Sequence, residues 1–436
     1  MKRNLTAYEK KAWQLVALCF IAYMTVYIGK KTISPCLKAM INEGIVDEGI
    51  GGVIGGCFLI VYAVGQLING WLGDRVHPRY MITGGLFLAG AMNILMSLNS
   101  YAPLFIVIWG FCGFFCSMLW PPIVRAVSEW TTESIAKDSA AALSVTIPLG
   151  QILCLAIVAL MLRISGWRAA FAVCGSILCV MAVVLYFLFG KLKEHMSASA
   201  PALSESAEND GKTEKEHAAP ALSAPIAAVF CVGIAFCAAG ILSNGMLKDG
   251  LDYWIPTILE NEFFHDASVA SFVTTILPIV NIVGVYAAKW IYQKYKLSEL
   301  AVCAATFAFS IVTLGGALVL LYTTSGAVAG IFFTVLVAMT TASMLGANSM
   351  LLTFIPLHFG KIGRASFVSG MLNACSYGAA ALSTMVTGFL SHHFGWTGVV
   401  LMFWIAAAFG AVVCFVGRNS LQKKYSEMEQ RSGESK

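Results

Sequence analysis

The chain has 436 residues, of which 58% are hydrophobic and 12% are charged, and its formal net charge is +5. A typical globular chain contains roughly 45–50% apolar and about 25% charged residues. The composition therefore predicts a membrane protein, and it argues against a soluble enzyme, a nucleic-acid binder and a secreted disulfide-rich domain.

Thirteen cysteines are present, nearly all inside apolar runs, and none forms a Cys-x-x-Cys pair. Buried free cysteines usually behave as small hydrophobic residues, so we expect neither a metal site nor redox chemistry. The sequence also lacks a Gly-x-x-x-x-Gly-Lys-Ser/Thr phosphate loop and an intramembrane nucleophile. We therefore expect no enzymatic activity and no cofactor.

A helix needs about 20 apolar residues to cross a bilayer, and the chain contains twelve such runs. They cover residues 13–40, 50–73, 80–99, 102–128, 139–163, 167–190, 225–258, 267–293, 298–323, 326–358, 365–391 and 395–417. The polar stretch 191–224 separates them into six and six, and its composition is typical of a flexible linker.

The expected fold is an all-α membrane protein of twelve transmembrane helices, in two six-helix parallel repeats typical of secondary transporters. Its parts would be an N-terminal segment 1–12, bundles 13–190 and 225–417, the linker 191–224 and a tail 418–436. Of the 28 Lys and Arg residues, 22 fall on one side of this topology, 3 on the other and 3 inside spans. The positive-inside rule therefore places both termini in the cytoplasm, with the chain as a monomer in the plasma (inner) membrane.

The loop after the second run is Gly70-Trp-Leu-Gly-Asp74-Arg75-Val-His-Pro-Arg79, and Arg125 lies near the end of the fourth run. An ordinary positively charged loop is the simpler interpretation. The pattern Gly-x-x-x-Asp-Arg with a following Pro-Arg also resembles the loop signature of the major facilitator superfamily. That resemblance implies a gate latch formed by this loop and Arg125. The equivalent stretch of the second half, 288–294, lacks the Gly and the Asp, so asymmetric gating contacts are expected.

Five charged residues lie inside apolar runs: Lys30, Lys31, Lys248, Asp249 and Asp252. A charge at the centre of a span costs roughly 2.5–3.5 kcal/mol on insertion scales, so these residues are candidates for function. Lys30 and Lys248 occupy similar places in the first helices of the two halves. Two facing cations at the midplane predict an anion-binding site, with a small anionic substrate as partner.

A structural alternative is that Lys248 pairs with Asp252, four residues on. Lys30 has no such partner, because the first carboxylate after it is Glu43. Tyr23, Tyr27 and Lys30 lie within about 60° of one another on a helix, which favours a cavity-lining stripe over simple packing. Lys31 is turned by about 100° from Lys30 and ranks below it.

The pattern Tyr23-x-x-x-Tyr27-x-x-Lys30 resembles the first helix of the organophosphate:phosphate antiporter family, which includes bacterial glycerol-3-phosphate and hexose-phosphate transporters. Trp120-Pro-Pro resembles its fourth helix, Lys248-x-Gly with Trp-x-Pro-Thr its seventh, and Ser-Gly with Tyr377-Gly its eleventh. The resemblance implies phosphoryl binding by Lys30 and Lys248, with inorganic phosphate as exchanged partner.

Five positions depart from the family pattern. Lys30 and Lys248 stand where the bacterial transporters usually carry arginine. Gly150 stands at a histidine position of helix five, Gln66 at a lysine position of helix two, and Asp249 at a tyrosine position. These departures leave the organic part of the substrate open. Gln151 and Asn373 are further candidates for the cavity lining, with interhelical hydrogen bonding as the alternative.

Three functions remain open from the sequence. The first is exchange of a phosphorylated metabolite for phosphate, with Lys30 and Lys248 holding the phosphoryl group. The second is proton-coupled symport of another organic anion, such as a sugar acid, with Asp249 or Asp252 carrying the proton. The third is a transporter-like sensor of phosphorylated sugars.

Overall fold

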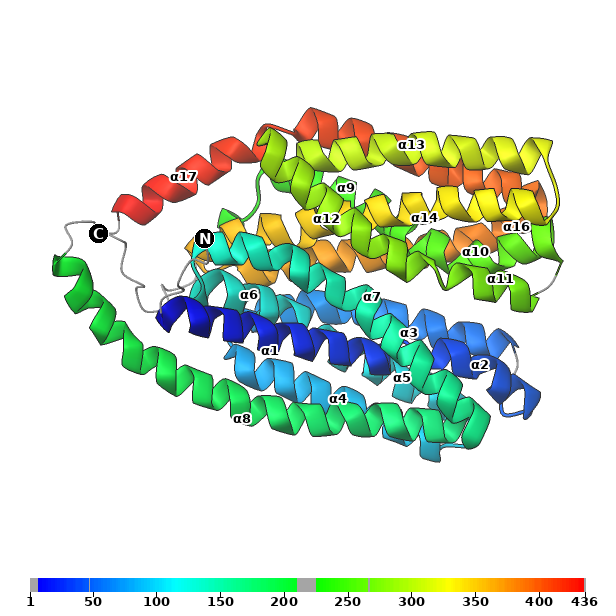
Figure 1. Cartoon of the computed structure of the whole chain (residues 1–436), viewed down its shortest axis with the longest axis horizontal. Helices are drawn as coiled ribbons and strands as arrows, with labels where there is room; N and C mark the ends of the chain where they lie inside the picture. The colour runs from blue at the N-terminus through cyan, green and yellow to red at the C-terminus, as the bar shows by residue number, and fades with distance from the viewer. Residues whose placement is uncertain (1–6, 47, 210–224, 266, 435–436) are drawn as a thin grey trace.

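The computed structural model describes residues 7–46, 48–209, 225–265 and 267–434. These residues form two helical bundles that lie side by side with their long axes parallel (Figure 1). One hydrophobic cluster fills the first bundle and a second fills the other. Nine helical segments are long and apolar enough to cross a membrane within the described residues.

The first bundle runs from the N-terminus through the following helices: α1 (Ala7–Lys30), α2 (Ile33–Asn42), α3 (Glu48–Gly73), α4 (Pro78–Leu98), α5 (Ala102–Ser117), α6 (Trp120–Trp130), α7 (Glu133–Ile164) and α8 (Gly166–Asn209). Local signals set several of these ends. The side chain of Thr132 accepts a hydrogen bond from the N–H of Ile135 at the start of α7, and α4 begins with Pro78 at its first turn.

The second bundle contains, in chain order, η1 (Ile226–Ala228), α9 (Val232–Gly245), the π-helical η2 (Met246–Gly250), α10 (Leu251–Leu259), the π-helical η3 (Glu260–Phe264), α11 (Ala267–Thr274), α12 (Leu277–Tyr295), α13 (Glu299–Thr323), α14 (Ala327–Ser349), the π-helical η4 (Met350–Phe354), α15 (Ile355–His358), η5 (Phe359–Ile362), α16 (Ala365–Gly417) and α17 (Ser420–Glu434). Within α16, Gly395 has φ 66° and ψ −176°, which only glycine adopts readily, so two straight helices meet there at a kink.

Helices extend past two of the expected boundaries, and the division into domains stays a prediction. The linker was expected to begin at residue 191, but α8 continues to Asn209, and residues 210–224 lie outside the described residues. The expected tail 418–436 was given no secondary structure, and it contains the helix α17. Glu and Lys favour helix at both places, and Ala adds to this in residues 191–209, so local propensity continues the structure past the last apolar residue.

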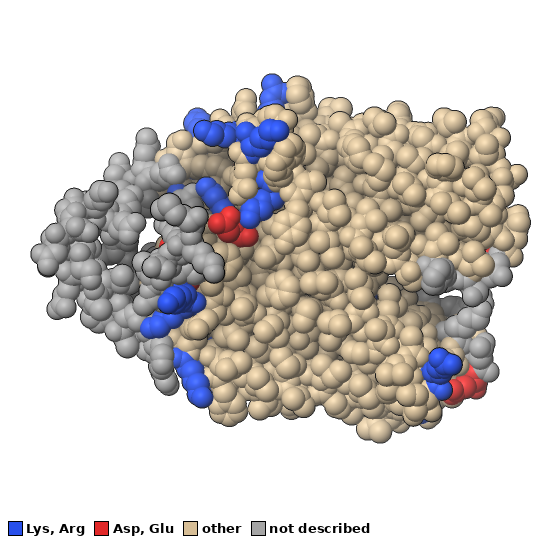
Figure 2. Space-filling model, viewed as in Figure 1, with Lys and Arg blue, Asp and Glu red and all other residues tan. Residues whose placement is uncertain are grey.

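Basic side chains gather at one end of the molecule. On the face shown in Figure 2, Lys and Arg lie mainly at the end where Figure 1 places both termini, and the middle of this face carries none. We call this end the basic end, defined by Arg75, Arg79, Arg125, Lys289 and Lys294. The end that carries α2 and α11 is called the opposite end (Figure 1).

Candidate functional site

Lys30, the last residue of α1, places its ammonium group in a cage of tyrosines. Lys30 Nζ donates a hydrogen bond of 2.7 Å to the hydroxyl of Tyr377 on α16. It also lies 3.8 Å from the ring centroid of Tyr62, 4.4 Å from that of Tyr377 and 5.0 Å from that of Tyr27. Lys30 is only 6% exposed. The faces of the rings and one phenol stabilise the charge, but they do not neutralise it.

Lys248 approaches the same tyrosine from the second bundle. It lies in the π-helical segment η2, and its Nζ is 2.6 Å from Oδ2 of Asp249 and 5.7 Å from the ring centroid of Tyr377. Tyr377 is therefore the common neighbour of both lysines. The structure brings together the two cations that the sequence singled out, together with Tyr27.

Both lysines lie where a helix is interrupted. The α-helix α1 ends at Lys30 and α2 resumes at Ile33, while Lys248 falls in the π-helical segment between α9 and α10. Interrupted and π-helical segments inside membrane proteins recur at binding sites, because they redirect side chains and free backbone groups. This correspondence between the two halves is a feature of the structure that spacing in the sequence did not predict.

The two carboxylates of this region differ in their contacts. Asp249 forms an ion pair with Lys248 and also interacts electrostatically with Lys31 and Lys30. Asp252 is half-buried, and the nearby charges that act on it are those of Lys31, Asp249 and Lys248. Within the described residues, the carboxylate of Asp252 has no hydrogen bond and no ion pair. The expected alternative, a pair between Lys248 and Asp252, is therefore not the pair that forms.

Tyr23 belongs to the wall of the cage. Its ring centroid is 5.3 Å from that of Tyr27 and 4.5 Å from that of Trp120 on α6. The indole N–H of Trp120 donates to the carbonyl oxygen of Leu352 in the second bundle at 3.4 Å. Tyr23 and Trp120 thus line the site on the side of the basic end.

Gln151 is half-buried on α7 and Asn373 is buried on α16, but no hydrogen bond of either side chain is seen within the described residues. Their place in the cavity lining stays a prediction. Gln66 on α3 is fully buried, and neither polar atom of its amide has a partner in the described part of the chain. A buried amide without partners is costly, which makes Gln66 a further candidate for the site.

Tyr62 and the packing role of Gly150 escaped prediction from the sequence. Tyr62 forms the closest ring to Lys30, yet it is one more aromatic residue in an apolar span, and nothing in the sequence marked it. Gly150 lets α7 approach α1, because a Cβ atom at this position would lie 2.5 Å from both the carbonyl oxygen of Met24 and the Cβ of Tyr27. No larger side chain fits there without a shift of α1.

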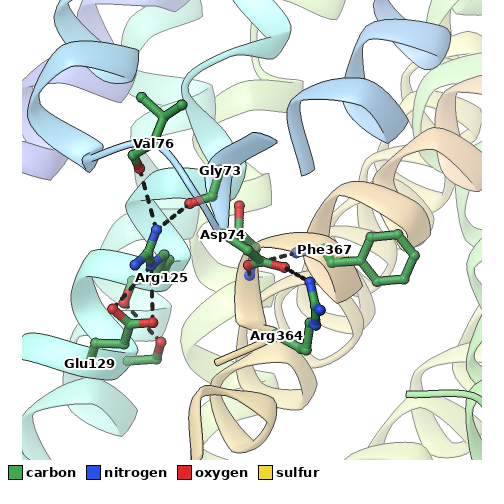
Figure 3. Close-up of polar contacts among 9 residues, drawn as sticks. Gly73, Asp74, Val76, Arg125, Glu129, Arg364 and Phe367 are labelled. Carbon is green, nitrogen blue, oxygen red and sulfur yellow. Dashed lines mark hydrogen bonds and ion pairs between the residues drawn. The ribbon is translucent and has the colours of Figure 1, made fainter. Parts of the chain in front are cut away.

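Asp74, from the loop after α3, reaches the second bundle at the basic end (Figure 3). Its Oδ1 accepts hydrogen bonds from the backbone N–H groups of Ser366 (3.1 Å) and Phe367 (3.3 Å), and its Oδ2 lies 3.5 Å from Nη1 of Arg364. A carboxylate at the first turn of α16 complements the helix dipole. Burial raises the pKa of Asp74 to about 6, opposed by the N–H of Phe367 and the charges of Arg364 and Arg125.

The other residues of the predicted latch act within the first bundle or by close packing. Arg125 donates to the carbonyl oxygens of Gly73 (2.7 Å) and Val76 (3.3 Å) and pairs with Glu129, which fixes the loop that carries Asp74 (Figure 3). Arg75 packs on the ring of Trp71, and Arg79 packs on the ring of Tyr186. Gly70 packs against Gly370, where an added Cβ would lie 3.0 Å from the Cα of Gly370.

The expected asymmetry between the halves has a structural counterpart. On α12 of the second half, Lys289 Nζ lies 3.1 Å from Oδ1 of Asp138 on α7. This contact joins the bundles at the basic end without an Asp in the second-half loop. It is more exposed than the contact of Asp74, since the side chain of Asp138 is 49% exposed and that of Asp74 is fully buried.

A family model described as Major Facilitator Superfamily matches residues 19–384. A probable hexose phosphate transport protein of Chlamydia muridarum is 28% identical over 166 residues, which are 38% of this chain and 36% of that protein. A glucose-6-phosphate exchanger of Danio rerio is 22% identical over 334 residues, covering 64% of this chain and 67% of that protein. A membrane sensor protein of Escherichia coli is 25% identical over 187 residues, with 43% and 42% covered.

The matches to the hexose phosphate transport proteins span only 36% to 40% of those proteins. The superfamily match spans most of the chain, and it agrees with the latch signature around Asp74. The chain therefore belongs to the Major Facilitator Superfamily, as a multi-pass membrane transporter rather than an enzyme, and it is distantly similar to transporters of hexose phosphate and glucose 6-phosphate.

Proposed function

We propose that this protein is a secondary active transporter that exchanges a phosphorylated metabolite for inorganic phosphate. Lys30 and Lys248 hold the phosphoryl group, and the two bundles rock around it by alternating access. Tyr377 stands between the two lysines and offers its hydroxyl to the same group. Twelve spans in two six-helix repeats, with both termini in the cytoplasm and the chain as a monomer in the plasma (inner) membrane, complete the proposal.

One observation carries this proposal. The ammonium group of Lys30 is buried inside an apolar bundle, and its only hydrogen bond in the described part of the chain goes to a neutral phenol. A buried charge without a counter-ion is expensive. An anion bound between Lys30 and Lys248 would supply the missing charge. The similarity to transporters of hexose phosphate and glucose 6-phosphate supports a phosphoryl group as that anion.

The contacts between the bundles agree with one state of a transport cycle. They run from Lys30–Tyr377 through Trp120–Leu352 to the contacts of Asp74 and Lys289 at the basic end. This arrangement fits a conformation closed at the basic end, in which substrate reaches the tyrosine cage from the opposite side.

Exchange of radiolabelled phosphate in proteoliposomes loaded with unlabelled phosphate tests the proposal. Lys30→Gln and Lys248→Gln should each lower the exchange rate by at least about 30-fold, because removal of one partner of a buried charged contact costs roughly 2–5 kcal/mol. Lys294→Gln is the matched control, since Lys294 is exposed at the basic end and lies 4.3 Å from the ring centroid of Trp290.

Phosphate exchange at the wild-type rate in both site variants would remove the lysines from the function. Uptake that requires an imposed pH gradient, without any exchange, would favour proton-coupled symport through Asp249 or Asp252. A protein that binds phosphorylated sugars but exchanges nothing would instead resemble the sensor of Escherichia coli.

A further inference from the structure

Two charges of opposite sign lack a partner in the same intramembrane region. Lys30 has no carboxylate within ion-pair distance, and the carboxylate of Asp252 has neither a hydrogen bond nor an ion pair, within the residues that the structure describes. Lys248 and Asp249, in contrast, satisfy each other at 2.6 Å. Lys31 also lacks an ion pair in the described residues, so the site presents two unpaired cations, Lys30 and Lys31, and one unpaired carboxylate.

The net charge of the region also favours a ligand that carries charges of both signs. Lys30, Lys31 and Lys248 face Asp249 and Asp252, and each of these carboxylates interacts with the charge of Lys31. The excess is one positive charge. A phosphomonoester carries a charge of about −1.5 to −2 near pH 7, so a plain sugar phosphate would leave the region negative. A phosphomonoester with one ammonium group brings the total close to neutral.

The spacing of the groups limits the size of the substrate. Asp252 follows Lys248 by four residues, so it lies about one helical turn, on the order of 6 Å, further along the same element. In the second bundle this direction leads from η2 into α10, toward the opposite end (Figure 1). An ammonium group at Asp252 would therefore lie on the side of the phosphoryl site that faces the opposite end.

We infer that the substrate is a phosphomonoester that carries a primary amine, with its phosphoryl group at Lys30 and Lys248 and its ammonium group at Asp252. This inference rests on the proposed function and names its substrate class. Asp249 stays with Lys248 and orients it, and Asp252 selects the amine. A hydroxyl in place of the ammonium leaves the half-buried Asp252 unpaired, and an unpaired charged group is how a polar site rejects an analogue.

Matched pairs of competitors test the inference. Each pair differs only in an ammonium against a hydroxyl group: 2-aminoethyl phosphate against 2-hydroxyethyl phosphate, and glucosamine 6-phosphate against glucose 6-phosphate. Inhibition of labelled phosphate exchange in proteoliposomes is the measurement. We expect the amine in at least one pair to inhibit at a concentration at least about tenfold lower than its hydroxyl counterpart.

Variants of Asp252 test whether this residue causes the preference for the amine over the hydroxyl compound. Asp252→Asn should make the two members of a pair inhibit alike, and Asp252→Glu should keep the preference because it keeps the carboxylate. Glu427→Gln, at an exposed glutamate of α17, is the matched control and should leave the preference as in the wild type. If Asp252→Asn abolishes exchange, thermal shifts of the purified variant with each pair give the same comparison.

The outcomes separate this inference from the proposed function. Equal inhibition by both members of both pairs overturns the inference and leaves phosphate exchange intact. A preference that survives in Asp252→Asn assigns the amine to another residue and also overturns it. Loss of pH dependence in Asp252→Asn without any amine preference makes Asp252 a proton carrier instead. Failure of every phosphomonoester and of phosphate to compete refutes the proposed function itself.

Discussion

At Lys30, the demands of stability and of binding oppose each other. Its ammonium group is buried among aromatic rings without a counter-ion in the described structure. Lys30→Met replaces the charge by an apolar chain of similar length. We expect this variant to be more stable by about 1–3 kcal/mol and inactive in phosphate exchange, since substitution of buried charges by apolar residues is often stabilising. Thermal unfolding in detergent, beside the exchange assay, measures both effects.

The matched control for this prediction is Val26→Met, also on α1 and buried, which removes no charge. It should not stabilise the protein. A loss of stability in Lys30→Met would mean that the lysine holds the cage together, and a structural role would then replace the proposed one.

The two lysines should also depend on each other. If Lys30 and Lys248 grip one phosphoryl group beside Tyr377, each contributes a charge-assisted contact of roughly 1.5–3 kcal/mol to the same ligand atoms. Lys30→Gln should then cost most of the affinity for phosphate, and Lys248→Gln added to it should cost little more. Phosphate competition for both single variants and the double variant gives the coupling energy. Strictly additive losses would indicate two separate sites.

Candidate site residues could be recognised in the sequence where a charged side chain interrupts an apolar span. Lys30 and Lys248 are conspicuous because charges are costly in apolar spans. Tyr62 and the packing role of Gly150 were missed, since an aromatic or a glycine in such a span is ordinary and only the packing of separate helices gives it this role. Arg364 was counted as one basic loop residue, and its distance of 3.5 Å to Asp74 depends on the closed arrangement of the bundles.

At the scale of helices, the crossing of α3 and α16 depends on two glycines. A Cβ on Gly370 would meet the carbonyl oxygen of Gln66 and lie 2.7 Å from the Cα of Gly70. Gly370→Ala should therefore push the two helices apart and disfavour closure at the basic end. Spin labels at Arg75 and Lys361, which are exposed on the two bundles, should report a longer distance by pulsed electron spin resonance.

Gly378→Ala is the matched control for this crossing, because a Cβ on Gly378 would meet nothing within 4 Å. It should leave the label distance unchanged. An unchanged distance in Gly370→Ala as well would mean that the crossing tolerates a side chain, and closeness of the glycines would then have no role in closure.

Helix positions followed from hydropathy more readily than helix interruptions did. Long apolar runs predicted most helices of the first half, because lipid requires every backbone group to bond within the helix. The π-helical turn around Lys248 and the kink at Gly395 were not predicted. Both depend on how a helix packs against its neighbours, and apolar composition is the same on either side of them.

For the whole molecule, the closed basic end should respond to pH through Asp74. Its pKa is about 6 in the closed state, and exposure to water on opening should return it toward the ordinary value of 3.8. Asp74 therefore binds its proton more tightly in the closed state than in the open state. As the pH falls through 6, the closed state gains stability relative to the open state. The gain is at most about 3 kcal/mol, complete below pH 3.8.

The same pair of spin labels measures this response. In the wild type the population with the short distance should rise between pH 7.5 and pH 4.5, and in Asp74→Asn it should stay constant. The exposed pair of Lys289 and Asp138 should contribute little, because exposed ion pairs are worth about 0–1 kcal/mol. A fall of the short-distance population at low pH would show that the ion pair with Arg364 outweighs the burial of Asp74.

The close approach of α7 to α1 at Gly150 limits how this transporter can change its specificity. The histidine that the resemblance places at this position cannot be introduced by one substitution, because its Cβ would meet the backbone of Met24 and the Cβ of Tyr27. Conversion toward the more basic sites of similar transporters would need α1 and α7 to be exchanged together. Because of Gly150, α1 and α7 have to come from the same transporter. A hybrid that takes α1 from one transporter and α7 from another should therefore fail to assemble the site.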